Sequence, residues 1–263
     1  MMNSESHPIN LPMLKKLIHE GLEAIPIDKE NQEAIIVIGD TGVGKSTIMS
    51  FLAGAQLMVK YDGLKPYLAS NNNKIKIGHE KLSETTVPTK AVIQNMAFYD
   101  CPGFKDNKGE EYEISNSFFV QRLLDIYQKV KLVLIVDESH ISETRADKLP
   151  KLIKNLHKSF KSFEDIRDGV CLIINRAAPD HSVDDYNKEI RKMTKLRNEL
   201  GPLFLDKEQE FLDFLMYKKR ILLFRQAAKE SSAFQPGQEE NSIINVVKGM
   251  SFVKSRHIEN ILS

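Results

Sequence analysis

A glycine-rich loop that directly follows an apolar run constrains the fold of this chain more than any other feature. Residues 34–38 read Ala-Ile-Ile-Val-Ile and predict a buried strand, and residues 39–46 continue Gly-Asp-Thr-Gly-Val-Gly-Lys-Ser. The three glycines permit backbone angles and close approaches that a Cβ would block, so successive N–H groups can converge on phosphate oxygens. The sequence therefore predicts a phosphate-binding loop between a strand and a helix over residues 46–54.

The side chains of this loop have separate expected roles. We expect Lys45 to lie exposed in the loop and to reach the terminal phosphates, and the Ser46 hydroxyl to ligate Mg²⁺. The residues expected to bind the nucleotide around its phosphates are Asp40, Thr41, Gly42, Val43, Gly44, Lys45, Ser46 and Thr47. The loop thus predicts binding of a nucleoside triphosphate with Mg²⁺.

A second motif, Asp-Cys-Pro-Gly at residues 100–103, ends the apolar run at 96–99. An aspartate at the carboxyl end of a core strand lies beside the phosphate loop, so we expect Asp100 to hold Mg²⁺ directly or through water. We expect the backbone N–H of Gly103 to contact the γ-phosphate, and glycine leaves the following segment free to move when that phosphate is lost.

Between the two motifs, the segment Ser-Glu-Thr-Thr-Val-Pro-Thr at residues 83–89 offers a hydroxyl for the metal. We favour Thr85, with Thr86 as the close alternative. The catalytic group expected from these motifs is Lys45, Thr85 and Gly103, and the expected metal ligands are Ser46, Thr85 and Asp100.

Strands and helices alternate along the chain, which predicts a three-layer α/β fold around a mainly parallel sheet. Besides the strand at 34–38, strands are expected at 74–77, 90–94, 96–100, 130–136, 170–174 and 221–224. Helices are expected at 11–25, 46–54, 115–128, 146–161, 183–199, 206–218 and 241–261. We expect an N-terminal helical extension (1–33), one nucleotide-binding domain (34–234), and a linker and helix (235–263) that pack on that domain or extend from it.

The combination of these motifs resembles the translation-factor-related GTPases of the septin-like branch, which includes septins, chloroplast-import receptors and immunity-associated GTPases. The resemblance covers roughly residues 34–225, with its specific motifs at 39–47 and 100–104. It implies a six-stranded sheet with one antiparallel edge strand. It also implies GTP and GDP as ligands, slow GTP hydrolysis, and frequent regulation by homodimerisation across the nucleotide face.

Two positions depart from the patterns of related GTPases. Phe104 stands where Ras-like enzymes carry the glutamine that orients the attacking water, so we expect low intrinsic turnover. The guanine-reading motif Asn-Lys-x-Asp becomes Asn-Arg-Ala-Ala, in which Asn175 and Arg176 are expected to bind the base. Ala178 cannot accept hydrogen bonds from guanine, and Asp180 reaches the base only if the loop bulges, so we expect a weak preference for guanine.

Two alternatives to a switch GTPase remain open. The chain can be a hydrolysis-deficient pseudo-GTPase scaffold, or an ATPase that uses Asp137 for the metal and Glu138 as the general base, because Asp-Glu-Ser-His at 137–140 resembles DEAH-type helicases. A helicase needs a second domain that closes on the nucleotide. In addition, Asp100 is already expected to hold the metal ion that Asp137 would bind in such an enzyme. Arg145 is a candidate arginine finger toward a neighbouring molecule.

Charge and hydropathy exclude several classes of function. The 37 basic and 36 acidic residues nearly cancel, so the chain has no general basic field for nucleic acid. The N-terminus lacks the layout of a secretory signal, and no stretch approaches the ~20 apolar residues of a transmembrane helix, so we expect a cytoplasmic protein. The basic run Lys218–Arg220 is weak grounds for peripheral membrane contact.

Overall fold

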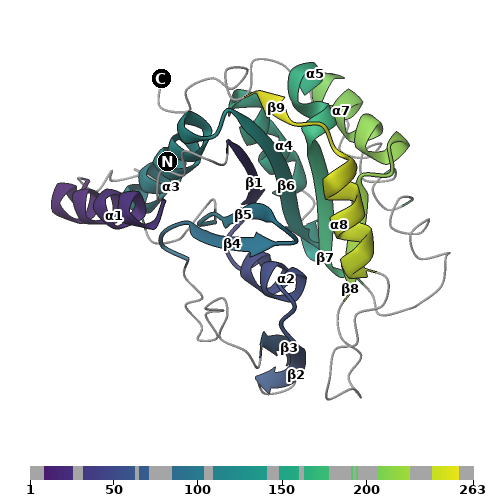
Figure 1. Ribbon diagram of the computed structural model, residues 1–263, viewed down its shortest axis with the longest axis horizontal. Helices are drawn as coiled ribbons and strands as arrows, with labels where there is room; N and C mark the ends of the chain where they lie inside the picture. Colours follow the sequence, from purple (N-terminus) through teal and green to yellow (C-terminus); the bar gives the residue numbers. More distant parts are fainter. Residues whose placement is uncertain are drawn as a thin grey trace, which may run out of the picture.

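A mainly parallel sheet forms the centre of the molecule (Figure 1). The computed structural model describes residues 9–25, 32–62, 65–70, 85–103, 109–140, 148–159, 163–177, 191, 194, 206–225 and 239–254. In spatial order, the six main strands are β4 (Thr89–Ile93), β5 (Met96–Asp100), β1 (Glu33–Ile38), β6 (Lys129–Asp137), β7 (Val170–Ala177) and β8 (Ile221–Arg225). Strand β4 runs antiparallel to β5 at one edge, and the remaining neighbours are parallel. The predicted fold class is confirmed.

Both faces of the sheet are buried, which explains why its central strands are continuous apolar runs. In β1, Ile36 and Ile38 face one hydrophobic cluster, whereas Ile35 and Val37 face the other. The helices whose side chains build the first cluster are α3 (Glu110–Ile126), α4 (Lys148–Ser159), α5 (Phe163–Ile166) and α7 (Asp206–Tyr217). The second cluster is built by α2 (Lys45–Leu52) and α8 (Glu239–Gly249). The protein therefore has three layers (Figure 1).

The N-terminal helix α1 (Leu11–Ala24) packs on α3 and lies outside the layer that α3 belongs to (Figure 1). Asn10 caps the helix, because its Oδ1 accepts a hydrogen bond from the Met13 N–H at 3.1 Å. The Asn10 N–H in turn donates to Oε1 of Glu111, at the start of α3, at 2.5 Å. This bond holds the starts of the two helices together.

A buried lysine attaches α8 to the sheet. Lys131 on β6 is 4% exposed, and its Nζ donates to the carbonyls of Val247 at 2.8 Å and Lys248 at 3.2 Å. Burial lowers the pKa of Lys131, although Glu33 opposes the change. A cation at the end of a helix satisfies carbonyls that have no partner within the helix. The same Nζ lies 4.3 Å from the centre of the Phe252 ring.

The expected closing helix over 241–261 is wrong at its C-terminal end. Helix α8 stops at Gly249, and Val253–Lys254 forms β9, which pairs antiparallel with the first two residues of β6. At Lys129 and Val130, β6 is not yet paired with β7, because β7 starts opposite Leu132.

Two other segments differ from expectation or cannot be compared with it. Strands β2 (Leu57–Asp62) and β3 (Lys65–Ser70) form an antiparallel hairpin that the sequence did not predict. The expected strand at 74–77 lies outside the described residues, as does the helix at 183–199 except for residues 191 and 194, which are helical. Within the described part of the chain, no helix is long and apolar enough to cross a bilayer.

The contact between α1 and α3 predicts the effect of a small substitution. A Cβ at Gly21 would clash with the ring of Phe119, which is fully buried. Overpacking costs roughly 1–3 kcal/mol, which exceeds the gain of about 1 kcal/mol from replacing a helical glycine. We therefore expect Gly21→Ala to lower the free energy of unfolding in urea by about 1 kcal/mol.

Gly249→Ala is the matched control, because a Cβ there meets nothing within 4 Å. It should leave the free energy of unfolding within about 0.5 kcal/mol of the wild-type value. Equal stability of both variants would contradict the packing of α1 against α3.

Candidate functional site

The candidate site lies at the edge of the sheet where the central parallel strands end. Strand pairing sets Val37 opposite Asp100 and Asp137 opposite Asn175. The carboxyl ends of β1, β5, β6 and β7 therefore meet beside the glycine-rich loop, which is the usual ligand-binding edge of an open α/β sheet. The sequence motifs at 39–46, 100–103 and 175–176 come together there.

The glycine-rich loop passes directly into α2, whose first residue is Lys45. Gly44 precedes the helix with φ +89°, and a Cβ at this position would clash with the side chain of Asn175. The N–H groups at the start of a helix have no partner within the helix and favour an anion. Of the flanking residues, Asp40 is buried, Thr41 is exposed, and Thr47 is half-buried on α2.

Lys45 does not lie exposed in the loop, as the sequence led us to expect. It is 6% exposed, and its Nζ donates to the carbonyls of Gly39 at 3.1 Å and Asp40 at 3.0 Å. The expectation failed because the loop curls around the lysine, so its own carbonyls satisfy the ammonium group. The positive charge is thereby held under the loop, where charge-assisted bonds to an anion are available.

Three oxygen-bearing side chains meet next to Lys45. The Ser46 hydroxyl donates to Oδ2 of Asp100, and its Oγ lies 3.3 Å from Oγ1 of Thr85. The other carboxylate oxygen of Asp100 is buried without a hydrogen-bond partner among the described residues. One carboxylate with two hydroxyls suits Mg²⁺, which takes few protein ligands and completes its shell with phosphates and water. The residues therefore fit the expected ion, and Thr85 is the threonine that the structure brings to Ser46.

Burial raises the pKa of Asp100 above its ordinary value, although Lys45 and the hydroxyls of Ser46 and Thr85 act in the opposite direction. The ionised carboxylate therefore lowers the stability of the folded protein when no ligand is bound. A divalent cation would supply the charge that Lys45 alone does not.

Gly103 lies against the phosphate loop. A Cβ at this position would clash with the backbone nitrogen and side chain of Thr41, so only glycine fits this approach. The Gly103 carbonyl accepts a hydrogen bond from Nδ2 of Asn116 on α3 at 2.8 Å. Asn116 is a site residue that no motif indicated; the available signal was an asparagine on the mostly apolar buried face of α3.

On the other side of the loop, Asn175 is buried and joins β7 to the loop. Its Nδ2 donates to the Val43 carbonyl at 2.7 Å, and its Oδ1 accepts from the Arg176 N–H at 2.8 Å. The Arg176 guanidinium donates to the Gly42 carbonyl at 3.1 Å and forms an ion pair with Asp137. Asn175 and Arg176 therefore both contact the loop.

Asp137 lies in this ion pair and not beside Ser46. Its other oxygen accepts from the Ser139 N–H at 3.0 Å. Burial alone would raise the pKa of Asp137, but the hydrogen bonds from Ser139 and the charge and hydrogen bond of Arg176 lower it overall. This environment favours Asp100 over Asp137 as the metal ligand.

Four residues from the sequence analysis lie outside the described residues: Phe104, Arg145, Ala178 and Asp180. Their expected effects on water activation, charge stabilisation and base recognition stay predictions.

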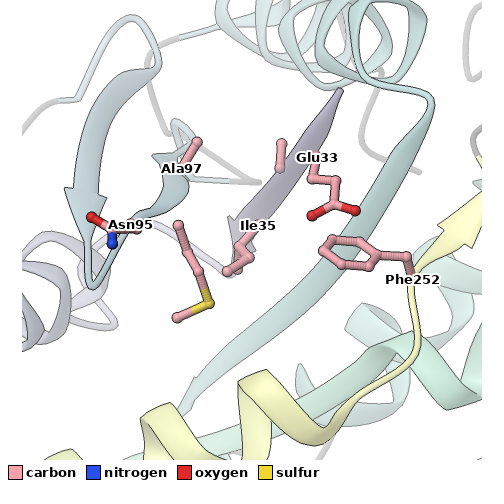
Figure 2. Close-up of a pocket in the computed structure, with 7 residues that line it drawn as sticks. Glu33, Ile35, Asn95, Ala97 and Phe252 are labelled. Carbon is pink, nitrogen blue, oxygen red and sulfur yellow. The ribbon is translucent and has the colours of Figure 1, made fainter. Parts of the chain in front are cut away.

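A pocket lies at the opposite end of β1 from the loop, between the start of that strand and Phe252 (Figure 2). The residues that line it are Glu33, Ala34, Ile35, Asn95, Met96, Ala97 and Phe252. It is mostly apolar and carries a carboxylate without a cationic side chain in its lining, so it does not suit phosphate.

The fold and the loop together define a P-loop nucleoside-triphosphate-binding protein. The family model described as 50S ribosome-binding GTPase matches residues 34–176, more than half of the chain. The protein belongs to this GTPase family, and the predicted recognition of a P-loop GTPase is confirmed.

Solved structures of chloroplast translocon components and of Toc33 have a similar fold. One is a structure from work on the chloroplast translocon components atToc33 and psToc159, whose dimerisation is important for GTPase activity. Its sequence is 13% identical to this chain, and the TM-score is 0.52, with 90% of this chain and 88% of that chain covered. Another is Toc33 from Arabidopsis thaliana with Mg²⁺ and GMPPNP, also 13% identical, with a TM-score of 0.52 over 92% and 94%. No curated protein sequence matches this chain.

The raised pKa of Asp100 predicts a pH-dependent stability difference in protein free of nucleotide and metal. Because the folded-state pKa lies above the ordinary 3.8, the stability associated with this group is present below that pH and is lost as pH rises through the folded-state pKa. We expect Asp100→Asn to melt a few degrees above wild type at pH 7 and to lose this advantage at low pH.

The control is Asp125→Asn, which removes a negative charge from the exposed side of α3. Thermal unfolding of all three proteins in chelator from acidic to neutral pH measures the effect. An Asp100→Asn variant that is less stable than wild type at pH 7 would contradict an electrostatic cost at this site.

Proposed function

We propose that the protein is a Mg²⁺-dependent GTP-binding protein with slow hydrolysis, which acts as a nucleotide switch or assembly unit. The observation that carries the proposal is the convergence of Lys45, Ser46, Thr85 and Asp100 at the loop between β1 and α2. The Mg²⁺ and GMPPNP bound by the Toc33 structure support this choice of ligands.

In this proposal, the N–H groups of residues 40–47 bind the phosphates, and Lys45 transfers its hydrogen bonds from the Gly39 and Asp40 carbonyls to the terminal phosphates. Ser46, Thr85 and Asp100 would hold Mg²⁺, which supplies positive charge for the developing negative charge of phosphoryl transfer. The close packing of Gly103 on Thr41 supports a role for its N–H as a sensor of the γ-phosphate.

Guanine is the proposed base, with Asn175 and Arg176 as its contacts from β7. The preference over adenine is proposed to be weak, because Ala178 replaces the aspartate that would accept hydrogen bonds from guanine. Residues 34–234 are the proposed GTPase domain, with 1–33 and 235–263 as its flanking helical parts, and the cytoplasm is the proposed compartment.

Low turnover by a single molecule follows from Phe104, which cannot orient a water molecule. In this proposal, dimerisation across the nucleotide face raises the turnover, because Arg145 of one molecule supplies a positive charge to the site of its neighbour. The reported importance of dimerisation in the translocon components supports this proposal by analogy. The alternative is a pseudo-GTPase scaffold, which keeps every phosphate contact and lacks turnover.

A pair of lysines tests the phosphate-loop assignment. Lys45 and Lys131 are both buried, and each donates to two backbone carbonyls, but Lys131 lies at the other end of the sheet. We expect Lys45→Ala to abolish GTP binding in calorimetry, because the charge-assisted bonds to the phosphates are lost. Lys131→Ala should lower stability and leave the GTP affinity of the folded fraction unchanged. GTP binding by Lys45→Ala within a few-fold of wild type would disprove the assignment.

The proposed role of dimerisation predicts that specific GTPase activity rises with protein concentration. A dimer should form with a non-hydrolysable GTP analogue and not with GDP, as measured by sedimentation. Constant activity from a strict monomer in both states would rule out the dimer mechanism. The absence of hydrolysis in single-turnover experiments at high protein concentration would instead favour the pseudo-GTPase.

A further inference from the structure

The ion pair between Asp137 and Arg176 is a charged feature of the site that phosphate and metal binding do not use. Arg176 is the second-last residue of β7, and Asp137 is the last residue of β6. Both lie on the side of the loop away from Ser46 and Asp100, next to Gly42 and Asn175.

The backbone at Arg176 is irregular in a way that directs this side chain. Its φ is +59°, a left-handed conformation that non-glycine residues rarely adopt. The pairing of β7 with β8 shifts register between Asn175 and Ala177, so Arg176 is an extra residue in the strand. Such irregularities re-aim side chains next to functional sites. The Asn175 Oδ1 stabilises this conformation by accepting from the Arg176 N–H.

The guanidinium is held at two points and is still accessible. One terminal nitrogen pairs with Oδ2 of Asp137, and the other donates to the Gly42 carbonyl at 3.1 Å. The Arg176 side chain is 53% exposed, whereas that of Asp137 is 12% exposed. A planar cation fixed along its edge keeps its face open to solvent.

Asp137 itself has little capacity left for a metal ion. Its Oδ1 accepts from the Ser139 N–H and its Oδ2 accepts from Arg176. The nearly buried carboxylate is thus committed to one side chain, and its effect on a ligand must pass through Arg176.

We propose that Asp137 is a positioning residue that locks the Arg176 guanidinium as a flat stacking surface for the base of the bound nucleotide. This inference rests on the proposed nucleotide binding at the neighbouring loop. Arginine stacks on aromatic rings through the face of its planar group. Locking the side chain before the ligand arrives removes the cost of ordering it on binding. Stacking acts on the ring face, so it does not depend on which groups the base carries at its edge.

The test compares GDP, IDP and pyrophosphate as competitors of a fluorescent GDP analogue. IDP lacks the 2-amino group of guanine, and pyrophosphate lacks the base altogether. Asp137→Asn keeps an oxygen for the Ser139 N–H and removes the charge that holds Arg176, whereas Arg176→Met removes the guanidinium. Asp168→Asn is the matched control, because Asp168 pairs with Arg220 before the start of β7, at the opposite edge of the sheet.

We expect Asp137→Asn to weaken GDP and IDP binding by the same factor, on the order of tenfold, with pyrophosphate binding unchanged. Arg176→Met should have at least as large an effect, and adding Asp137→Asn to it should cause no further loss. The Asp168→Asn control should bind all three ligands like wild type. The difference between nucleotides and pyrophosphate should persist without Mg²⁺.

Three results would overturn the inference: unchanged GDP affinity in Asp137→Asn, an equal loss for pyrophosphate, or a loss for GDP that spares IDP. The second would place Asp137 at the phosphates or the metal, and the third would indicate recognition of the base edge. If Asp137→Asn does not fold, a purely base-dependent loss in Arg176→Met supports the stacking surface, and unchanged affinities overturn it. Wild-type protein that binds neither GDP nor pyrophosphate would instead refute the proposed function, and this inference with it.

Discussion

The parallel pairing of β1 with β5 and β6 is the constraint on which the candidate site depends. Parallel strands end at the same edge, so the register that aligns Val37 with Asp100 also delivers the ends of β6 and β7 to the loop. Helix α2 then starts at that edge and directs the N–H groups of its first turn toward the loop. Two polar tethers, from Asn116 to Gly103 and from Asn175 to Val43, fix the flanking segments. Sheet geometry thus determines the site's position, and side-chain hydrogen bonds determine its shape.

Features that depend on local pattern were predictable from the sequence, and those that depend on contacts between distant segments were not. The central strands follow from apolar runs, and the glycine-rich loop and Asp100 follow from motif spacing. The ion pair of Arg176 with Asp137 and the hydrogen bond from Asn116 join residues far apart in the chain, and no periodicity encodes them. The burial of Lys45 depends on loop conformation and not on residue type. Strand β9 was missed because its two residues form a strand only through their pairing with β6.

Burial of Asp100 next to Lys45 links stability to ligand binding at this site. A carboxylate surrounded by protein loses its hydration, and one lysine with two hydroxyls compensates only in part, because the pKa stays raised. If only the stability of the ligand-free protein mattered, a neutral residue would be more favourable than an aspartate at this position. Keeping a destabilising charge is common where the charge serves a ligand. Ligand binding to the folded state would then recover the lost stability.

The bonds from Lys131 to α8 affect the order in which the chain can fold. Val247 comes 116 residues after Lys131, and β9 follows α8, so the start of β6 gains these partners only when almost the whole chain is available. During synthesis from the N-terminus, the early strands and their helices emerge long before α8. Until then, the Lys131 ammonium must remain hydrated, which keeps this end of the sheet open. Closure by contacts so distant in sequence is slow, because the entropy of a long loop is lost before the contacts form. Docking of α8 is therefore expected to be a late step in folding.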